Sequence, residues 1–170
     1  MKVNRCRHAV CLAPVFLAFL VLIFVALAAS PSASSEEMLA VARDGVMLRA
    51  VPGVHGKALW RYDQGLPLKI IGAQGDWRRV RDFEGDGGWL LFSDLNQEPH
   101  MVVCAKTSSG EQVGANIRKG PGDEYQMVGK AAYGAVFSTL EYKLGWVRVR
   151  HVEPGMKVEG WIKRNLLWGF

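Results

Sequence analysis

Residues 48–53 have the sequence LRAVPG, and residues 117–122 have the sequence IRKGPG, 69 positions later. The same offset relates WRRVR at 77–81 to WVRVR at 146–150, and the GWL of residues 88–90 returns as GWI at 160–162, shifted by 72. The second half of the chain therefore repeats the first. Two copies are too few for a stacked solenoid, so this period predicts two small domains in tandem.

Within each copy, the sequence predicts strands and turns rather than helices. The chain has 19 glycines, and many of them separate short runs rich in β-branched and aromatic residues. Three such runs in the first copy are residues 66–71, 77–81 and 88–91. Short strands broken by turns about every 8–12 residues are typical of small barrels and sandwiches. We therefore predict an all-β protein.

The first 29 residues predict an export signal. Lys2, Arg5 and Arg7 precede an uncharged run over residues 9–29 that ends in small residues, which is the pattern of a secretory signal peptide. An uncleaved membrane anchor is the alternative, because a spanning helix needs about 20 apolar residues. We expect export to the periplasm or cell envelope, and membrane contact only if this segment stays uncleaved.

Two polar stretches predict the domain boundaries. Residues 30–37 are Ser-rich and predict a linker after the signal, and residues 96–99, which end in Pro99, predict a break between the copies. We therefore place a first domain at 38–97 and a second domain at 100–168.

Charge and cysteine content argue against a nucleic-acid partner and against an internal disulfide. Without the three positive charges of residues 1–29, the chain has 18 basic and 16 acidic residues, a balance that does not indicate a nucleic-acid partner. Cys104 is the one cysteine outside that segment, so we expect no internal disulfide. Its apolar neighbours predict a buried thiol.

The order of short motifs along the chain resembles the bacterial SH3 domain family, in tandem. The motifs are NIRKGPG at 116–122, the strand from Gly134 to Phe137, GDWRRV at 75–80 and DFEGDGGW at 82–89. Together they cover nearly all of residues 40–167. The first copy departs from the family pattern at residues 46–51, and the second copy departs at its last hairpin, 153–157. The resemblance implies a five- to seven-stranded partly open barrel in each copy. It also implies a targeting or ligand-holding role in exported proteins of the cell wall.

The repeated Trp-x-Arg-x-Arg pattern is the strongest candidate binding surface. Side chains alternate across a strand, so the tryptophan and both arginines of each copy share one face, while Val147 and Val149 face the core. Tryptophan offers a flat apolar contact, and arginine binds carboxylates with two hydrogen bonds. Solvated arginines beside a structural tryptophan are the alternative. The predicted ligand-binding residues are Trp77, Arg79, Arg81, Trp146, Arg148, Arg150, Tyr125 and Tyr133. Weaker rim candidates are Trp60, Tyr62 and Tyr142.

Catalytic and metal sites are not predicted. The acids of residues 82–87 match the start of a calcium loop, but the twelfth position is Ser93 rather than the glutamate such a loop needs. A hairpin turn is the better interpretation. The sequence contains no nucleophile or zinc motif, so we expect no enzyme, no cofactor and no metal.

These observations predict an exported, non-enzymatic binding module that recognises a cell-wall (peptidoglycan) peptide or an envelope protein. The alternative is a structural or assembly protein that uses its barrels for protein–protein contact without a small ligand. The sequence gives no indication of oligomeric state.

Overall fold

The computed structural model of the chain describes residues 37–153 and 156–170. The predicted signal at 1–29 lies outside the described residues, as does the linker apart from its last residue. The described residues all belong to one compact unit. Within the described ranges, no helix is long and apolar enough to cross a membrane.

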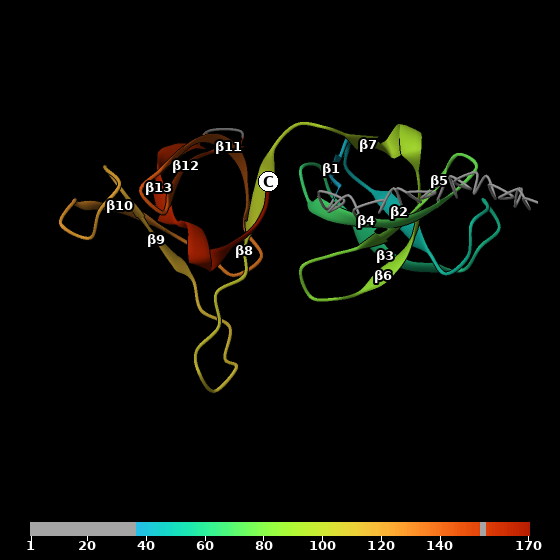
Figure 1. The fold of residues 1–170 in the computed structure, drawn as a ribbon, viewed down its shortest axis with the longest axis horizontal. Coiled ribbons are helices and arrows are strands. Elements are labelled where there is room, and N and C mark those ends of the chain that lie inside the picture. Colours follow the sequence, from blue (N-terminus) through green and yellow to red (C-terminus); the bar gives the residue numbers. More distant parts are fainter. Residues whose placement is uncertain (1–36, 154–155) are drawn as a thin grey trace, which may run out of the picture. The chain divides into compact units, whose positions relative to one another are not determined.

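The first copy forms a seven-stranded antiparallel sheet with the order β3-β2-β6-β5-β4-β1-β7 (Figure 1). Its elements are β1 (Met38–Val41), β2 (Val46–Arg49), β3 (Ala58–Tyr62), β4 (Pro67–Gln74), β5 (Trp77–Arg81), β6 (Gly87–Leu91), the short 3-10 helix η1 (Phe92–Asp94) and β7 (Leu95–Asn96).

The second copy repeats this topology with the order β10-β9-β13-β12-β11-β8-β14. Its elements are β8 (His100–Val103), β9 (Ala115–Arg118), β10 (Met127–Ala131), β11 (Val136–Lys143), β12 (Trp146–Glu153), β13 (Met156–Lys163), the short 3-10 helix η2 (Arg164–Leu166) and β14 (Leu167–Gly169). The predicted all-β fold, with two SH3-like sheets in tandem that do not close into full barrels, is confirmed.

The two sheets share even their irregularities. A β-bulge interrupts the β4–β5 pairing between Ile70 and Gly72, and another interrupts the β11–β12 pairing between Thr139 and Glu141. These positions are 69 residues apart. A bulge bends its strand and increases the local twist, so each sheet curves at the same place around its core.

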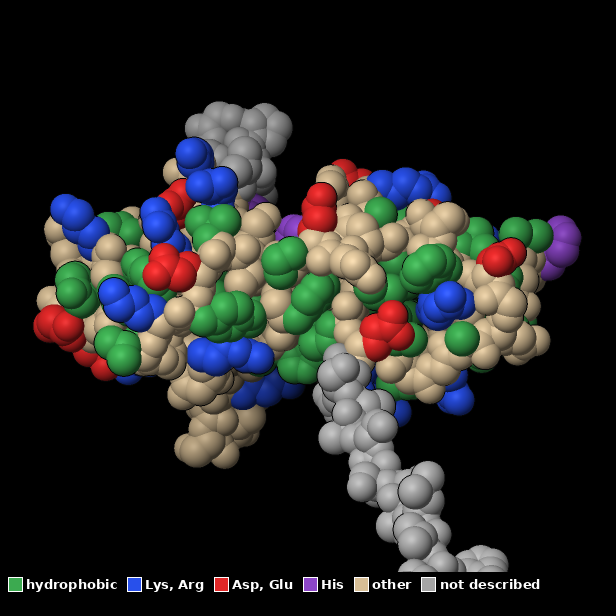
Figure 2. Space-filling view, turned by 45° about the horizontal axis from the view of Figure 1, so that its top comes forward, with side chains coloured by type: hydrophobic (Ala, Val, Ile, Leu, Met, Phe, Trp, Pro, Cys, Tyr) green, Lys and Arg blue, Asp and Glu red, His purple; other side chains and the backbone are tan. Residues whose placement is uncertain are grey.

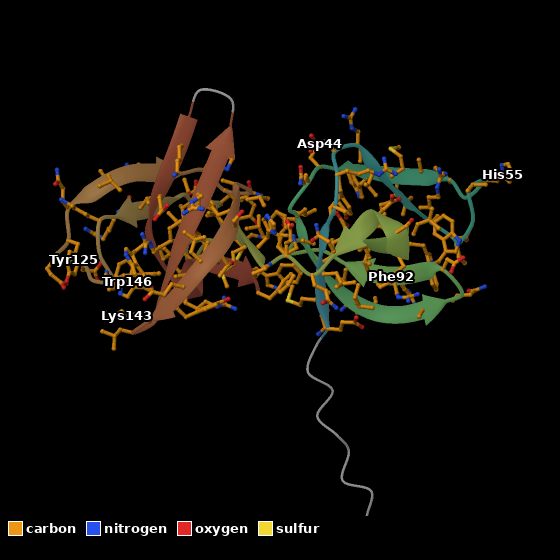
Figure 3. All side chains as sticks on the ribbon, turned by 90° about the horizontal axis from the view of Figure 1, so that it is seen from above. Asp44, His55, Phe92, Tyr125, Lys143 and Trp146 are labelled. Carbon is orange, nitrogen blue, oxygen red and sulfur yellow. The ribbon has the colours of Figure 1, made fainter. Side chains whose placement is uncertain are left out.

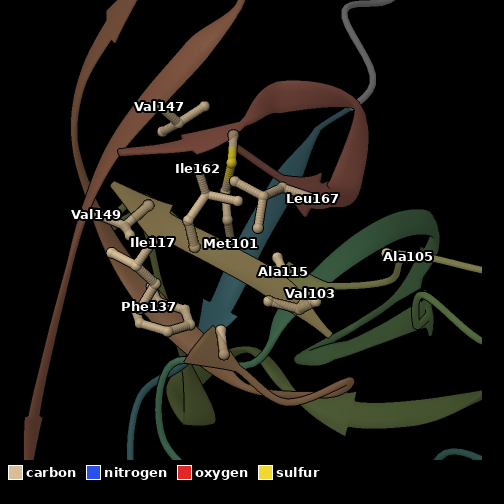
Figure 4. Packing of buried hydrophobic residues seen from close by; sticks show 11 residues of the cluster. Met101, Val103, Ala105, Ala115, Ile117, Phe137, Val147, Val149, Ile162 and Leu167 are labelled. Atoms are coloured by element: carbon tan, nitrogen blue, oxygen red, sulfur yellow. The ribbon is translucent and has the colours of Figure 1, made fainter. Parts of the chain in front are cut away.

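Each copy has its own apolar core. The core of the first copy includes Leu48, Leu68 and Val80, none of which is exposed to solvent. Figure 4 shows the larger cluster of the second copy. Val147 and Val149 are fully buried in it, as the alternation of β12 predicted. Neither core contains a disulfide, so these small sheets depend on core packing and hydrogen bonds.

The repeat is not uniform at its start. Residues 42–45 connect β1 to β2, whereas residues 104–114 connect β8 to β9. The longer connection folds back on itself through an isolated bridge between Lys106 and Gln112. Cys104 begins this connection and is half-buried rather than fully buried. Partial burial raises the pKa of its thiol, which lowers its reactivity.

The turn between β5 and β6 is built around one buried carboxylate. Asp82 accepts hydrogen bonds from the backbone N–H groups of Glu84 (3.0 Å) and Asp86 (2.9 Å). It also accepts one from the hydroxyl of Tyr62 at 2.7 Å. The predicted hairpin turn is therefore confirmed. Tyr62 is buried, so its assignment to an exposed rim was wrong, and burial followed by the Asp82 contact raises its phenol pKa above the usual range.

Both sheets need a glycine at the same point of close approach between two strands. A Cβ at Gly88 would lie 2.7 Å from the carbonyl oxygen of Arg49, and one at Gly160 would lie 2.7 Å from that of Arg118. These are the first residues of the two Gly-Trp motifs. The absence of a side chain lets β6 reach β2, and lets β13 reach β9.

We predict that Gly88→Ala destabilises the protein by about 1–3 kcal/mol, because the added methyl overpacks a close backbone contact. The matched control is Gly72→Ala, since a Cβ there meets only the Cβ of Arg79 at an ordinary 3.5 Å. Urea unfolding of both variants measures the difference. Equal stability of the two variants would contradict the close-approach argument.

Candidate functional site

A small pocket lies beside Trp146 in the second copy. Trp146 is the first residue of β12 and follows a two-residue turn in which Leu144 and Gly145 both have positive φ, 50° and 79°. Such turns match the twist of a hairpin. This one holds the tryptophan at the start of its strand, and Figure 3 shows Tyr125 on the same side of the second copy. The pocket has a volume of about 180 Å³ and is lined by Gly114, Asn116, Arg118, Asp123, Trp146, Lys163 and Leu166.

Two cations and one carboxylate line this pocket. The ammonium of Lys163 donates to Asp123 at 2.6 Å and lies 5.4 Å from the centre of the Trp146 ring. Arg118 is 3.5 Å from the same carboxylate. The hydrogen bond from Lys163 lowers the pKa of Asp123. With two positive charges and one negative charge, the pocket favours a ligand that carries a carboxylate.

The first copy has a pocket at the equivalent place. It has a volume of about 190 Å³ and is lined by Arg43, Gly45, Val46, Met47, Arg49, Val54, Trp77, Leu91 and Asp94. Trp77 and Arg49 correspond to Trp146 and Arg118. Arg43 donates to Asp94 at 2.7 Å. Both copies therefore place a tryptophan, an arginine and a carboxylate around a small hollow.

The chemistry of the two pockets differs. Asn116, Asp123 and Lys163 of the second copy correspond to Met47, Val54 and Leu91 of the first. Three polar positions are thus apolar in the first copy. The two pockets share a frame but favour different ligand groups.

The tryptophans are less exposed than an outward-facing binding surface would require, which agrees with the alternative of a structural tryptophan. Trp146 is only 8% exposed, and Trp77 is half-buried. Each contributes one wall of its pocket rather than an open platform. Strand alternation does place the arginines Arg79, Arg81 and Arg148 outside, where they are exposed.

The arginines of the second copy already have an acidic partner. Glu159, on the neighbouring strand β13, accepts hydrogen bonds from both Arg148 and Arg150, the latter at 3.0 Å. The hydrogen bond from Arg150, and then that from Arg148, lowers the pKa of Glu159. In the first copy Gly87 follows the turn at the corresponding place, and within the described residues neither Arg79 nor Arg81 has an ion-pair partner.

The two candidate tyrosines lie in different places. Tyr125 is 43% exposed and lies next to the Trp146 pocket, where its carbonyl accepts a 2.8 Å hydrogen bond from Arg118. Tyr133 instead packs against Phe83 of the first copy, with ring centres 5.7 Å apart. Lys106 reaches the same region and donates to Glu84 at 3.3 Å. Tyr133 therefore joins the two copies and does not line a tryptophan pocket.

Lys163 and Asp123 were missed by sequence reasoning. Lys163 follows the second Gly-Trp motif by two positions, and Asp123 follows the second Pro-Gly. Comparing the two copies could have found them, because a charged residue replaces an apolar one at both positions, and such a change between repeats marks a candidate binding position. The contact between them depends on how β13 folds back, which no local pattern indicates.

Figure 2 shows one face of the molecule, on which lysines, arginines and acids lie among hydrophobic side chains. Within the described residues, no group of three or more His, Cys, Asp or Glu side chains is placed to hold a metal ion.

Comparison with known proteins establishes the family. Residues 42–95 and 111–169 match the bacterial SH3 domain, so the chain belongs to that family. It is 23% identical over 126 residues to a protein of Bacillus subtilis (strain 168) named "Putative N-acetylmuramoyl-L-alanine amidase YrvJ". That match covers 72% of this chain but only 24% of the relative.

Two solved structures match the chain at low similarity. An NlpC/P60 family protein from Bacillus cereus ATCC 10987 has a TM-score of 0.36 and 14% identity, covering 79% of this chain and 56% of its own. NlpC2 from Trichomonas vaginalis has a TM-score of 0.32 and 14% identity, covering 79% and 49%.

The paired arginines give a test with opposite outcomes. If the Arg148 and Arg150 face binds carboxylates of peptidoglycan, Arg148→Ala with Arg150→Ala should weaken retention on isolated peptidoglycan. Glu159→Gln should strengthen retention, because it releases both guanidinium groups from their internal partner.

Co-sedimentation at low and high salt measures both effects, since exposed charges are screened by salt. The midpoint of thermal unfolding should change little in either variant, because exposed ion pairs contribute little to stability. Retention that is the same in all three proteins at low salt would exclude this face.

Proposed function

We propose that this chain is an exported, non-enzymatic binding protein that holds cell-wall peptides in the tryptophan pockets of its two SH3-like domains. The observation that carries the proposal is the repetition of one pocket, beside Trp77 and beside Trp146. A pocket retained at the same place in both copies, while its lining changes, is expected of a binding site. The family match and the relative named as an amidase support a cell-wall setting.

The charges favour a peptide over a neutral sugar. Lys163 and Arg118 offer charged donors to a carboxylate, while Asp123 offers an acceptor to an amine. Trp146 offers an apolar wall to the adjoining backbone or side chain. Short peptides with acidic side chains and a free carboxylate match this arrangement.

A role without catalysis is part of the proposal. The chain spans about a quarter of the length of the curated relative, 24%, so that relative's named activity does not transfer to it. Cys104 is half-buried with a raised pKa, which opposes a thiolate nucleophile. We propose that the pockets retain a wall ligand and do not cleave it.

An assembly role is the second candidate. Trp60 on β3 is 56% exposed and Phe92 is 47% exposed, with the guanidinium of Arg78 4.4 Å from the Phe92 ring centre. Exposed aromatic side chains of this size suit contact with another protein. This candidate predicts capture of an envelope protein without retention on peptidoglycan.

The pocket is tested by Lys163→Ala. This change removes the exposed ammonium that faces Trp146, so we expect retention on isolated peptidoglycan to fall roughly tenfold, the effect of one lost charge-assisted hydrogen bond. The matched control is Lys57→Ala, which removes an exposed lysine that lines neither tryptophan pocket. Equal losses in the two variants would attribute retention to general charge, and no loss in either would favour the assembly role.

Export is tested at the N-terminus of the protein recovered from the cell envelope. We expect processing near Ala28 or Ala29, where the uncharged run ends in small residues. N-terminal sequencing or intact mass measures this. A membrane-extracted species that still begins at Met1 would support the anchor instead.

A further inference from the structure

The second copy has an apolar cavity on the core side of its sheet, separate from the tryptophan pocket. Its volume is about 210 Å³, and it is lined by Ile117, Gly129, Lys130, Ala131, Ala132, Ala135, Phe137, His151 and Val158. Ile117 faces this cavity, whereas its neighbours Asn116 and Arg118 face the tryptophan pocket. The two hollows therefore lie on opposite faces of β9.

The first copy shows what fills the equivalent space. Tyr62 ends β3 and pairs with Val46, and Ala131 ends β10 and pairs with Ala115, in the same register. Tyr62 is buried in the first core, where its hydroxyl bonds to Asp82. In the second copy, Ala131 occupies the position that corresponds to Tyr62.

The residue that accepts the hydrogen bond of the Tyr62 hydroxyl in the first copy, Asp82, also differs in the second copy. His151 occupies the position that corresponds to Asp82, and it is half-buried. Its Nδ1 lies 3.0 Å from the carbonyl oxygen of Val136, and its ring is 5.4 Å from that of Phe137. A polar side chain is thus retained at the end of the space that the phenol leaves.

The larger side chain of Phe137 does not compensate for the missing ring. Phe137 stands where the first copy has Leu68, but Ala115 also replaces Val46. The remaining 210 Å³ exceeds the volume of about 150 Å³ at which an apolar cavity admits benzene. The cavity is therefore large enough for one aromatic side chain.

The strand beside the cavity has a free edge. Within the described residues, β10 pairs with β9 alone and ends the sheet. Met127 and Val128 on β10 are 47% and 49% exposed. A free edge next to a side-chain pocket is the arrangement by which sheets bind extended peptides, since the backbone gives affinity and the pocket gives specificity.

We propose that the second copy binds an extended segment of a partner polypeptide along β10, with a tyrosine side chain of that segment in the cavity beside Ala131. The partner's ring takes the place that Tyr62 holds in the first copy. The first copy does not offer this site, because its own tyrosine fills it. This function is independent of wall-peptide binding at the Trp146 pocket.

The test uses the full protein and two acetylated, amidated pentapeptides, Thr-Val-Tyr-Val-Thr and Thr-Val-Ala-Val-Thr. We expect the tyrosine peptide to bind at least roughly tenfold more tightly by calorimetry. In methyl NMR spectra, its binding should shift the signals of Ala131 and Ala135. Equal affinity of the two peptides would overturn the proposal.

A free phenol tests the cavity separately from the strand edge. p-Cresol, which is the tyrosine side chain without its backbone, should compete with the tyrosine peptide and shift the same methyl signals. Saturable binding of p-cresol without binding of the peptide would overturn the polypeptide partner, because it would show that the cavity admits only small phenols.

Filling the cavity should abolish binding. Ala131→Tyr restores the residue of the first copy and is expected to reduce peptide affinity at least roughly tenfold. Ala58→Tyr on β3 is the control, since it adds an exposed tyrosine outside the cavity and should bind as before. If Ala131→Tyr does not fold, Ala135→Val is the second variant. It adds two methyl carbons rather than a phenol ring, narrows the same cavity and should weaken binding. Unchanged affinity in a folded filling variant would overturn the proposal.

The result is distinguishable from that of the proposed wall function. Lys163→Ala, at the end of β13, changes the tryptophan pocket on the opposite face of β9 and should leave pentapeptide binding unchanged, whatever its effect on peptidoglycan. A parallel loss of both activities in Lys163→Ala would contradict two separate sites.

Discussion

The close approach of two backbones at one glycine in each copy is the constraint on which the rest of the structure depends. Gly88 lets β6 pair with β2 through Trp89 and Arg49, and Gly160 lets β13 pair with β9 through Trp161 and Arg118. Within the described residues, this is the pairing that joins β2 and β3, or β9 and β10, to the rest of their sheet. The same contact positions an arginine of the tryptophan pocket, so closure of the sheet and formation of the site have one cause.

The two copies have the same strand arrangement but different side chains at several positions. The core positions remain apolar in both copies, because each small sheet has to bury its own core without a disulfide. The pocket positions vary more, as Val54 against Asp123 and Leu91 against Lys163 show. Under the proposed function, a retained architecture with a changed lining would let the two copies hold different parts of one ligand, or two ligands.

The connection over residues 104–114 adds a feature that the first copy lacks. It positions Lys106 beside Glu84, while Tyr133 packs on Phe83. These contacts involve the β5–β6 turn, whose shape is held by the buried carboxylate of Asp82. An internal hydrogen-bond network of the first copy therefore also supports its contact with the second.

The sequence by itself determined the strand character, the duplication and the family, because these depend on local alternation, glycine placement and motif order. It also determined that Val147 and Val149 belong to the core and that residues 82–86 make a turn. Tertiary structure alone decided the surroundings of each candidate residue. Trp146 is buried and forms one wall of its pocket, Arg148 and Arg150 share Glu159, and Tyr62 lies in the first core. These outcomes depend on contacts between strands that are distant in the chain, such as Asp123 with Lys163, and a local pattern carries no information about which strands will meet.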